Sequence, residues 1–63
     1  MESFPQTIGL SGEEARRIIN GVDANLTVHI VPEGSMVTMD FRTDRVRVFV
    51  DEGGIVRSAP HVG

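Results

Sequence analysis

Two adjoining stretches of the sequence decide the fold. Residues 33–44 read Glu-Gly-Ser-Met-Val-Thr-Met-Asp-Phe-Arg-Thr-Asp, and residues 45–50 read Arg-Val-Arg-Val-Phe-Val. The second stretch alternates and is rich in β-branched residues, which predicts a strand with its valines facing a core. The first is a long connection with unusual apolar content, and long connections in compact domains tend to be functional. From the pattern alone, it is either a further strand in an ordinary hairpin or an exposed apolar loop that binds another protein.

A helix and further strands surround this stretch. Ser11 followed by Glu14 predicts a capping box at the start of a helix over about residues 12–23. Ala15, Ile18, Ile19 and Val22 recur at helical spacing and should form its apolar stripe. Residues 26–31 alternate as a strand, and residues 51–54 indicate a turn. Residues 55–62 predict a weaker final strand, which Pro60 interrupts, so that it lies at an edge of the sheet or is short.

Size and composition exclude several classes of protein. The chain has 63 residues and no cysteine, so one small domain without disulfides is expected. Its two histidines, His29 and His61, have no ligand-like spacing, and no metal or cofactor is expected. A net charge of −3 argues against nucleic-acid binding. No apolar run approaches the about 20 residues that span a bilayer, and no signal peptide is evident, so a soluble protein of unknown compartment is expected.

Residues 34–50 together closely resemble the reactive loop and following strand of the potato inhibitor I family of serine protease inhibitors, which includes the barley chymotrypsin inhibitors and the eglins. The likeness extends to the N-terminal segment, the helix start and the C-terminus, and so covers about residues 4–63. It implies an α+β fold, in which a small twisted mixed β-sheet packs on a single α-helix. It also implies a long exposed reactive loop, about residues 33–44, between two parallel strands. Residues 1–63 would form one such domain.

The resemblance also implies roles for individual residues, none of them catalytic. Met39–Asp40 would be the reactive bond, with Met39 entering the primary specificity pocket of the protease. The loop residues expected to contact the protease are Ser35, Met36, Val37, Thr38, Phe41 and Arg42. The residues expected to support the loop are Arg45, Arg47 and Gly63. The expected partners are serine proteases with apolar specificity pockets, of the chymotrypsin or subtilisin type. The inhibitor itself is expected to be a monomer.

Physical reasoning supports these roles but leaves alternatives open. Arg45 and Arg47 are two apart on a strand, so both point to one face and could brace Thr38 and Asp40 in the absence of disulfides. The alternative is that they are solvated strand charges, whose ion pairs contribute about 0–1 kcal/mol, but a loop without disulfides favours the bracing role. Met39 could be a core filler. With polar neighbours on both sides it is better suited to exposure, and its long uncharged side chain suits an apolar pocket rather than the acidic pocket of trypsin.

The sequence therefore predicts a reversible, substrate-like inhibitor of serine endopeptidases. A loop already fixed in the extended shape that a protease binds loses little freedom on binding, which strengthens the complex. The main rival is a non-inhibitory binding module that keeps the same fold and holds another partner. A small enzyme is a more distant third reading, because so short a chain has little room for a catalytic cleft.

Overall fold

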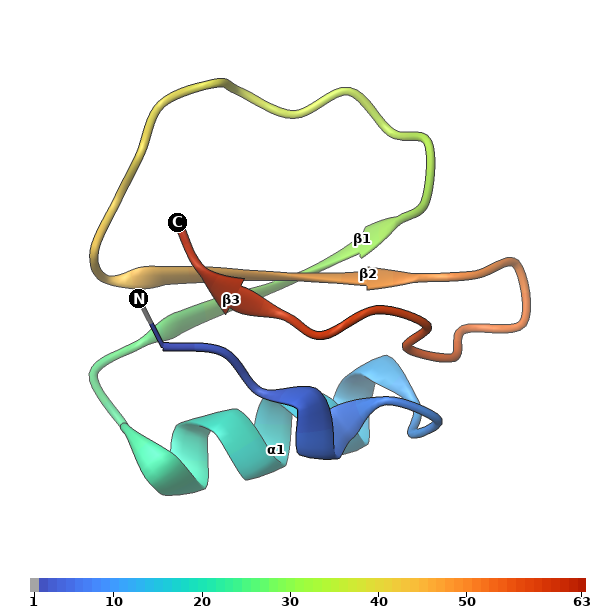
Figure 1. The fold of residues 1–63 in the computed structure, drawn as a ribbon, viewed down its shortest axis with the longest axis horizontal. Coiled ribbons are helices and arrows are strands. Elements are labelled where there is room, and N and C mark those ends of the chain that lie inside the picture. The colour runs from blue at the N-terminus through green and yellow to red at the C-terminus, as the bar shows by residue number, and fades with distance from the viewer. Residues whose placement is uncertain (1) are drawn as a thin grey trace.

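The computed structural model describes residues 2–63, so Met1, with which the expected domain begins, lies outside the described residues. The elements follow one another as a 3₁₀ turn η1 (Pro5–Thr7), the helix α1 (Gly12–Val22) and the strands β1 (Thr27–Pro32), β2 (Arg45–Val50) and β3 (His61–Val62). Figure 1 shows α1 on one side of the sheet and the β1–β2 connection arching away on the other side. The predicted α+β fold class is confirmed.

The sheet is mixed, with strand order β1-β2-β3. β1 pairs with β2 in parallel over six residue pairs from Thr27↔Arg45 to Pro32↔Val50, and β2 pairs with β3 in antiparallel. Parallel neighbours need a long crossover, which is most often a helix. Here an irregular loop of residues 33–44 makes that crossover, as the resemblance implied. The loop therefore starts and ends at opposite ends of two adjacent strands (Figure 1).

The helix begins where the sequence places it. The Ser11 side chain accepts a hydrogen bond from the Glu14 amide, and the Glu14 side chain accepts from the Ser11 amide, so the capping box is present. Ala15 and Ile19 are fully buried, as predicted. The rest of the predicted stripe is wrong, because Ile18 and Val22 are 38% and 55% exposed. A sheet of three strands offers too narrow a face to cover a four-residue stripe.

The core lies between α1 and the inner face of the sheet. Val46, Val48 and Val50 of β2 are buried, as their alternation predicts, while Arg45 and Arg47 point to the other face. The other buried apolar residues are Phe4, Ala15, Ile19, Leu26, Val56 and Val62. Every second residue of the central strand thus packs towards the helix, and the intervening residues Arg45 and Arg47 face the side of the sheet that carries the loop.

The predicted final strand lies at an edge of the sheet and is short, as expected, but it covers fewer residues than 55–62. Only His61 and Val62 form a strand, whereas Ile55 and Val56 make isolated bridges to Ser11 and Val50. The Pro60 carbonyl accepts a hydrogen bond from the Phe4 amide at 2.8 Å, so the segment before β3 pairs with the N-terminus instead. Proline has no amide proton to give to a ladder, which explains why the strand starts only after it.

Candidate functional site: the loop of residues 33–44 and its supports

Residues 33–44 contain no strand and are exposed throughout. The alternative of a further strand in an ordinary hairpin is therefore wrong. Met36 and Met39 are almost fully exposed, at 99% and 96%, and Phe41 is 56% exposed. Apolar side chains of this size are rarely left in water together without a partner. The alternative that Met39 fills the core is also excluded by its exposure.

The two ends of the loop are fixed by local structure. At its start, the Ser35 amide donates to the Pro32 carbonyl at 3.2 Å, and Gly34 adopts a φ of +85°, which glycine tolerates best. At its end, Arg42 Nε lies 3.2 Å from Asp44 Oδ1 in an exposed ion pair. The Asp44 carbonyl then accepts from the Thr27 amide at 2.8 Å, which ties the loop end to β1. Arg42, expected to contact the protease, is thus drawn towards the base of the loop.

Arg45 joins three parts of the chain. Its Nε donates to the Gly63 carbonyl at 2.8 Å, one terminal nitrogen donates to the Asp40 carbonyl at 2.7 Å, and the other lies 3.3 Å from Asp40 Oδ2. The side chain is only 11% exposed. A planar guanidinium offers five donors in a rigid fork, so it can satisfy several acceptors at fixed positions at once. The reading of Arg45 as a solvated strand charge is therefore wrong.

Arg47 supports the loop on the other side of the Met39–Asp40 bond. Its terminal nitrogen donates to Thr38 Oγ1 at 2.7 Å and lies 4.0 Å from Asp40 Oδ1. The pKa of Asp40 is lowered from its ordinary value of 3.8, first by a hydrogen bond from the Thr38 side chain, whose effect exceeds the opposing effect of desolvation, and to a lesser extent by Arg45. The contacts predicted between the arginines and the two residues around the bond are present. Arg47 contacts both Thr38 and Asp40, and Asp40 in turn contacts Arg45, so the four residues form one connected group.

Phe41 rests beside the C-terminus. A Cβ atom placed on Gly63 would lie 3.9 Å from the ring of Phe41, and the Gly63 amide donates to the Arg45 carbonyl at 2.9 Å. The last residue of the described chain is therefore held by Arg45 through both its amide and its carbonyl groups. Figure 1 shows the C-terminus inside the arch of the loop. The position expected of Gly63, close to the supporting arginines, matches this arrangement.

Sequence reasoning missed the side chains beneath the first half of the loop. A hollow of about 330 Å³ lies there, lined by His29, Val31, Met36, Val37, Thr38, Arg45 and Arg47. His29 pairs across the sheet with Arg47, which in turn pairs with His61, so Arg47 lies between two histidines. Alternation places His29 on one face of its strand, but only the parallel register shows that this face carries the loop.

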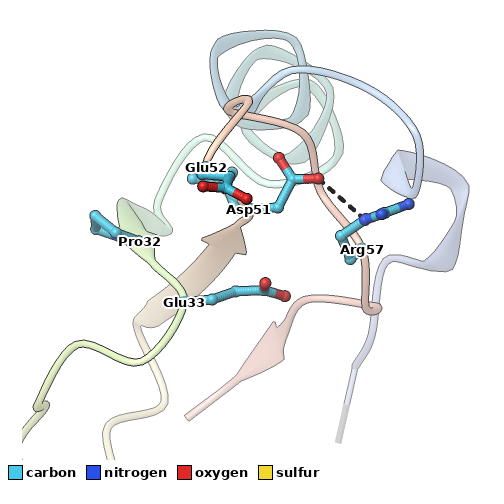
Figure 2. Close-up of a pocket in the computed structure, with 6 residues that line it drawn as sticks. Pro32, Glu33, Asp51, Glu52 and Arg57 are labelled. Carbon is cyan, nitrogen blue, oxygen red and sulfur yellow. Dashed lines mark ion pairs between the residues drawn. The ribbon is translucent and has the colours of Figure 1, made fainter.

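A second hollow, of about 530 Å³, lies away from the Met39–Asp40 bond. It is lined by Pro32, Glu33, Val50, Asp51, Glu52 and Arg57. Figure 2 shows the acidic side chains around it, with Asp51 joined to Arg57 at 3.0 Å. Within residues 2–63, no group of three or more histidine, cysteine or acidic residues could hold a metal ion. No helix among the same residues is long and apolar enough to cross a membrane.

Comparison with known proteins identifies the family of this chain. A model of the potato inhibitor I family matches residues 1–63. The Glu S. griseus protease inhibitor of Momordica charantia is 46% identical over 61 residues, covering 97% of this chain and 90% of that protein. Eglin C of Hirudo medicinalis is 41% identical over 64 residues, covering 100% and 91%. The crystal structure of bitter gourd trypsin inhibitor, 41% identical, superposes with a TM-score of 0.94 and covers 100% of this chain and 93% of that one. The chain belongs to the potato inhibitor I family.

Proposed function

We propose that this protein is a reversible, substrate-like inhibitor of serine endopeptidases with apolar specificity pockets, and that it presents the Met39–Asp40 bond to them. One observation carries the proposal. The bond lies on an exposed loop, and hydrogen bonds from the sheet hold the residues on both of its sides, Thr38 and Asp40. Residues 1–63 would act as one domain and as a monomer. Inhibition, and no enzymatic activity, is what membership of this family indicates.

The side chain at position 39 supports the choice of target. Met39 is 96% exposed, long, unbranched and uncharged, so it can enter an apolar pocket of the chymotrypsin or subtilisin type. It offers no cation to the acidic pocket of trypsin. The relatives are named for different proteases, among them trypsin and a Glu S. griseus protease. A common scaffold with different targets fits a specificity that is set by loop residues.

The arrangement of the loop supports inhibition rather than rapid cleavage. A protease binds an extended segment, and a flexible segment loses conformational freedom on binding. Here hydrogen bonds from Arg45 and Arg47 already limit that freedom. If the protease cuts the bond, the same contacts keep the new ends at residues 39 and 40 in place. The acyl-enzyme then reverts more readily than water can reach it, and the complex persists.

The other loop residues would form the rest of the contact surface. Ser35, Met36, Val37 and Thr38 would bind before the bond, and Phe41 and Arg42 after it. A complex of this kind usually buries about 1,600 Å² in total. The exposure of all these residues supports their availability. The supporting residues Arg45, Arg47 and Gly63 would stay behind the loop, out of contact with the protease.

Titration of chymotrypsin and subtilisin tests the proposal. We expect both enzymes to be inhibited at or below micromolar inhibitor, and Met39→Lys to move inhibition towards trypsin. Phe41→Leu, a change on the other side of the bond, serves as a control that should not make trypsin a target. Absence of inhibition of both enzymes by the folded protein would refute the proposal and favour the rival, a binding module with the same fold. An unaltered profile for Met39→Lys would show that another residue enters the specificity pocket.

A further inference from the structure

The methionines of the loop are the most easily oxidised groups that the structure displays. The sequence contains three methionines and no cysteine, tryptophan or tyrosine. Two of the methionines, Met36 and Met39, lie on the loop with 99% and 96% of their surface exposed. No thiol in the chain can therefore react first with an oxidant. Within residues 2–63, the sulfur chemistry of the protein is confined to its proposed contact surface.

Resting on the function proposed above, we propose that Met39 is a site of reversible oxidation by hydroperoxides, and that its sulfoxide switches the loop to a weakly binding state. In this step a lone pair of the thioether sulfur attacks one oxygen of the hydroperoxide. The O–O bond breaks as the S–O bond forms, so that sulfur loses two electrons and the peroxide is reduced. The other peroxide oxygen takes up the proton of the hydroxyl group that was transferred to sulfur. It leaves as water when the oxidant is hydrogen peroxide, or as an alcohol when it is an organic hydroperoxide.

Exposure makes the reaction at Met39 possible without unfolding. Susceptibility of methionine follows access of the oxidant to sulfur, and packing in a core normally restricts that access. Met39 has no such protection in the free protein. A protease that takes the side chain into its specificity pocket would cover the sulfur. Complex formation should therefore slow oxidation of Met39, and should slow oxidation of Met36, three residues away, to a smaller extent.

The consequence of oxidation follows from what does and does not touch Met39. A sulfoxide is polar, and moving it from water into an apolar pocket without a hydrogen-bond partner is unfavourable. We expect inhibition to weaken by about 10- to 100-fold. The supports of the loop act on Thr38 and Asp40, and none of their hydrogen bonds uses Met39. The fold and the loop conformation should therefore survive oxidation.

The experiment compares each protein with itself before and after treatment with hydrogen peroxide. Inhibition of chymotrypsin is measured for the original chain, for Met39→Leu and for Met36→Leu, and peptide mass mapping locates each sulfoxide. Leucine keeps the apolar character and approximate volume of methionine but cannot be oxidised. We expect the original chain and Met36→Leu to lose inhibition on treatment, whereas Met39→Leu keeps its own starting level. Methionine sulfoxide reductases acting on both sulfoxide epimers should restore the loss.

Several results would overturn the inference. They are a Met39 that resists peroxide in the free protein, a Met39 sulfoxide form that inhibits as strongly as the untreated protein, or a Met39→Leu variant that loses inhibition as the original chain does. A loss that the reductases do not reverse would contradict the reversible switch. Untreated protein that does not inhibit would refute the proposed function itself, and this inference with it. Titration before treatment therefore separates the two kinds of failure.

Discussion

Replacement of Arg45 by alanine should weaken inhibition far more than replacement of Arg47. Arg45 donates two hydrogen bonds to the loop, to the Asp40 carbonyl at 2.7 Å and to Asp40 Oδ2 at 3.3 Å, and a third to the Gly63 carbonyl at 2.8 Å. Arg47 donates one comparably short bond, to Thr38. At about 1.5 kcal/mol for each hydrogen bond from a charged donor, the bound loop conformation loses about 3 kcal/mol in Arg45→Ala and about 1.5 kcal/mol in Arg47→Ala. The inhibition constants should rise by roughly 100-fold and 10-fold.

The assay is a titration of chymotrypsin with each variant, combined with mass spectrometry of cleavage at Met39–Asp40. Arg57→Ala is the matched control, because it removes the same charge from an exposed arginine that pairs with Asp51 and does not contact the loop supports. We expect it to inhibit like the original chain. Circular dichroism on heating shows whether each variant is folded at the assay temperature. The double variant Arg45→Ala with Arg47→Ala should be cleaved fastest of all.

One outcome would refute this account of the loop. If folded Arg45→Ala inhibited within about threefold of the original chain and was cleaved no faster, the hydrogen bonds to Asp40 and Gly63 would not fix the binding conformation. Equal losses in Arg57→Ala and Arg45→Ala would point instead to overall charge. A larger loss in Arg47→Ala than in Arg45→Ala would reverse the order derived from the contacts.

Two further predictions concern the scaffold. Gly12→Ala should destabilise the protein by about 1–3 kcal/mol, because the new Cβ would lie 2.8 Å from Cγ2 of Ile30. Gly21→Ala in the same helix is the control: its Cβ meets nothing within 4 Å, so it should stabilise the protein by about 0.5 kcal/mol. Urea unfolding of both variants measures these effects, and similar effects of the two changes would contradict the prediction. The pKa of Asp51 is lowered from 3.8, first by the hydrogen bond from the Ile55 amide, so its contribution to stability is fully present above pH 3.8 and is lost as pH falls through the lower folded value. Unfolding between pH 2 and 6 should therefore show a smaller acid loss in Asp51→Asn than in the original chain, and equal losses would contradict the assignment.

Local signals in the sequence were sufficient for the helix start and the central strand. The capping box at Ser11 and Glu14 depends on two side chains three residues apart, and such a contact can be predicted without knowledge of the rest of the fold. The alternation of Val46 and Val48 with the arginines likewise predicted which face is buried. These features are decided within one turn or one strand.

Features that depend on distant pairing could not be derived from the pattern. Nothing in the alternation of residues 26–31 shows that this strand runs parallel to β2 rather than forming a hairpin with it, and that direction came from the resemblance. The exposure of Ile18 and Val22 depends on the width of the sheet. The position of His29 beneath the loop depends on the register.

Part of the candidate site could likewise be predicted from local signals, and part depends on distant pairing. Spacing predicted only that Arg45 and Arg47 share a face, because residues two apart on a strand do so, and their role as supports of the loop came from the resemblance. The sequence could not predict which loop residue each arginine contacts, since this depends on where the loop passes each guanidinium group. Arg45 contacts Asp40 and Gly63, whereas Arg47 contacts Thr38. The resemblance placed Gly63 near the arginines, and the structure adds the hydrogen bond that links them.

The parallel pairing of β1 and β2 has a consequence for the chain once the loop is cut. A break after Met39 would leave β1 and β2 on separate polypeptides, and the six residue pairs between these strands in the intact chain would hold the two pieces together. The two new ends then meet as parts of a two-fragment complex, at an effective concentration set by the fold and independent of dilution. Rejoining of the two ends would then be a unimolecular step that competes with dissociation of the fragments. In an unstructured substrate the fragments separate after cleavage, so rejoining would be much slower. If the proposed protease cuts the loop, the crossover would therefore favour resealing of the peptide bond.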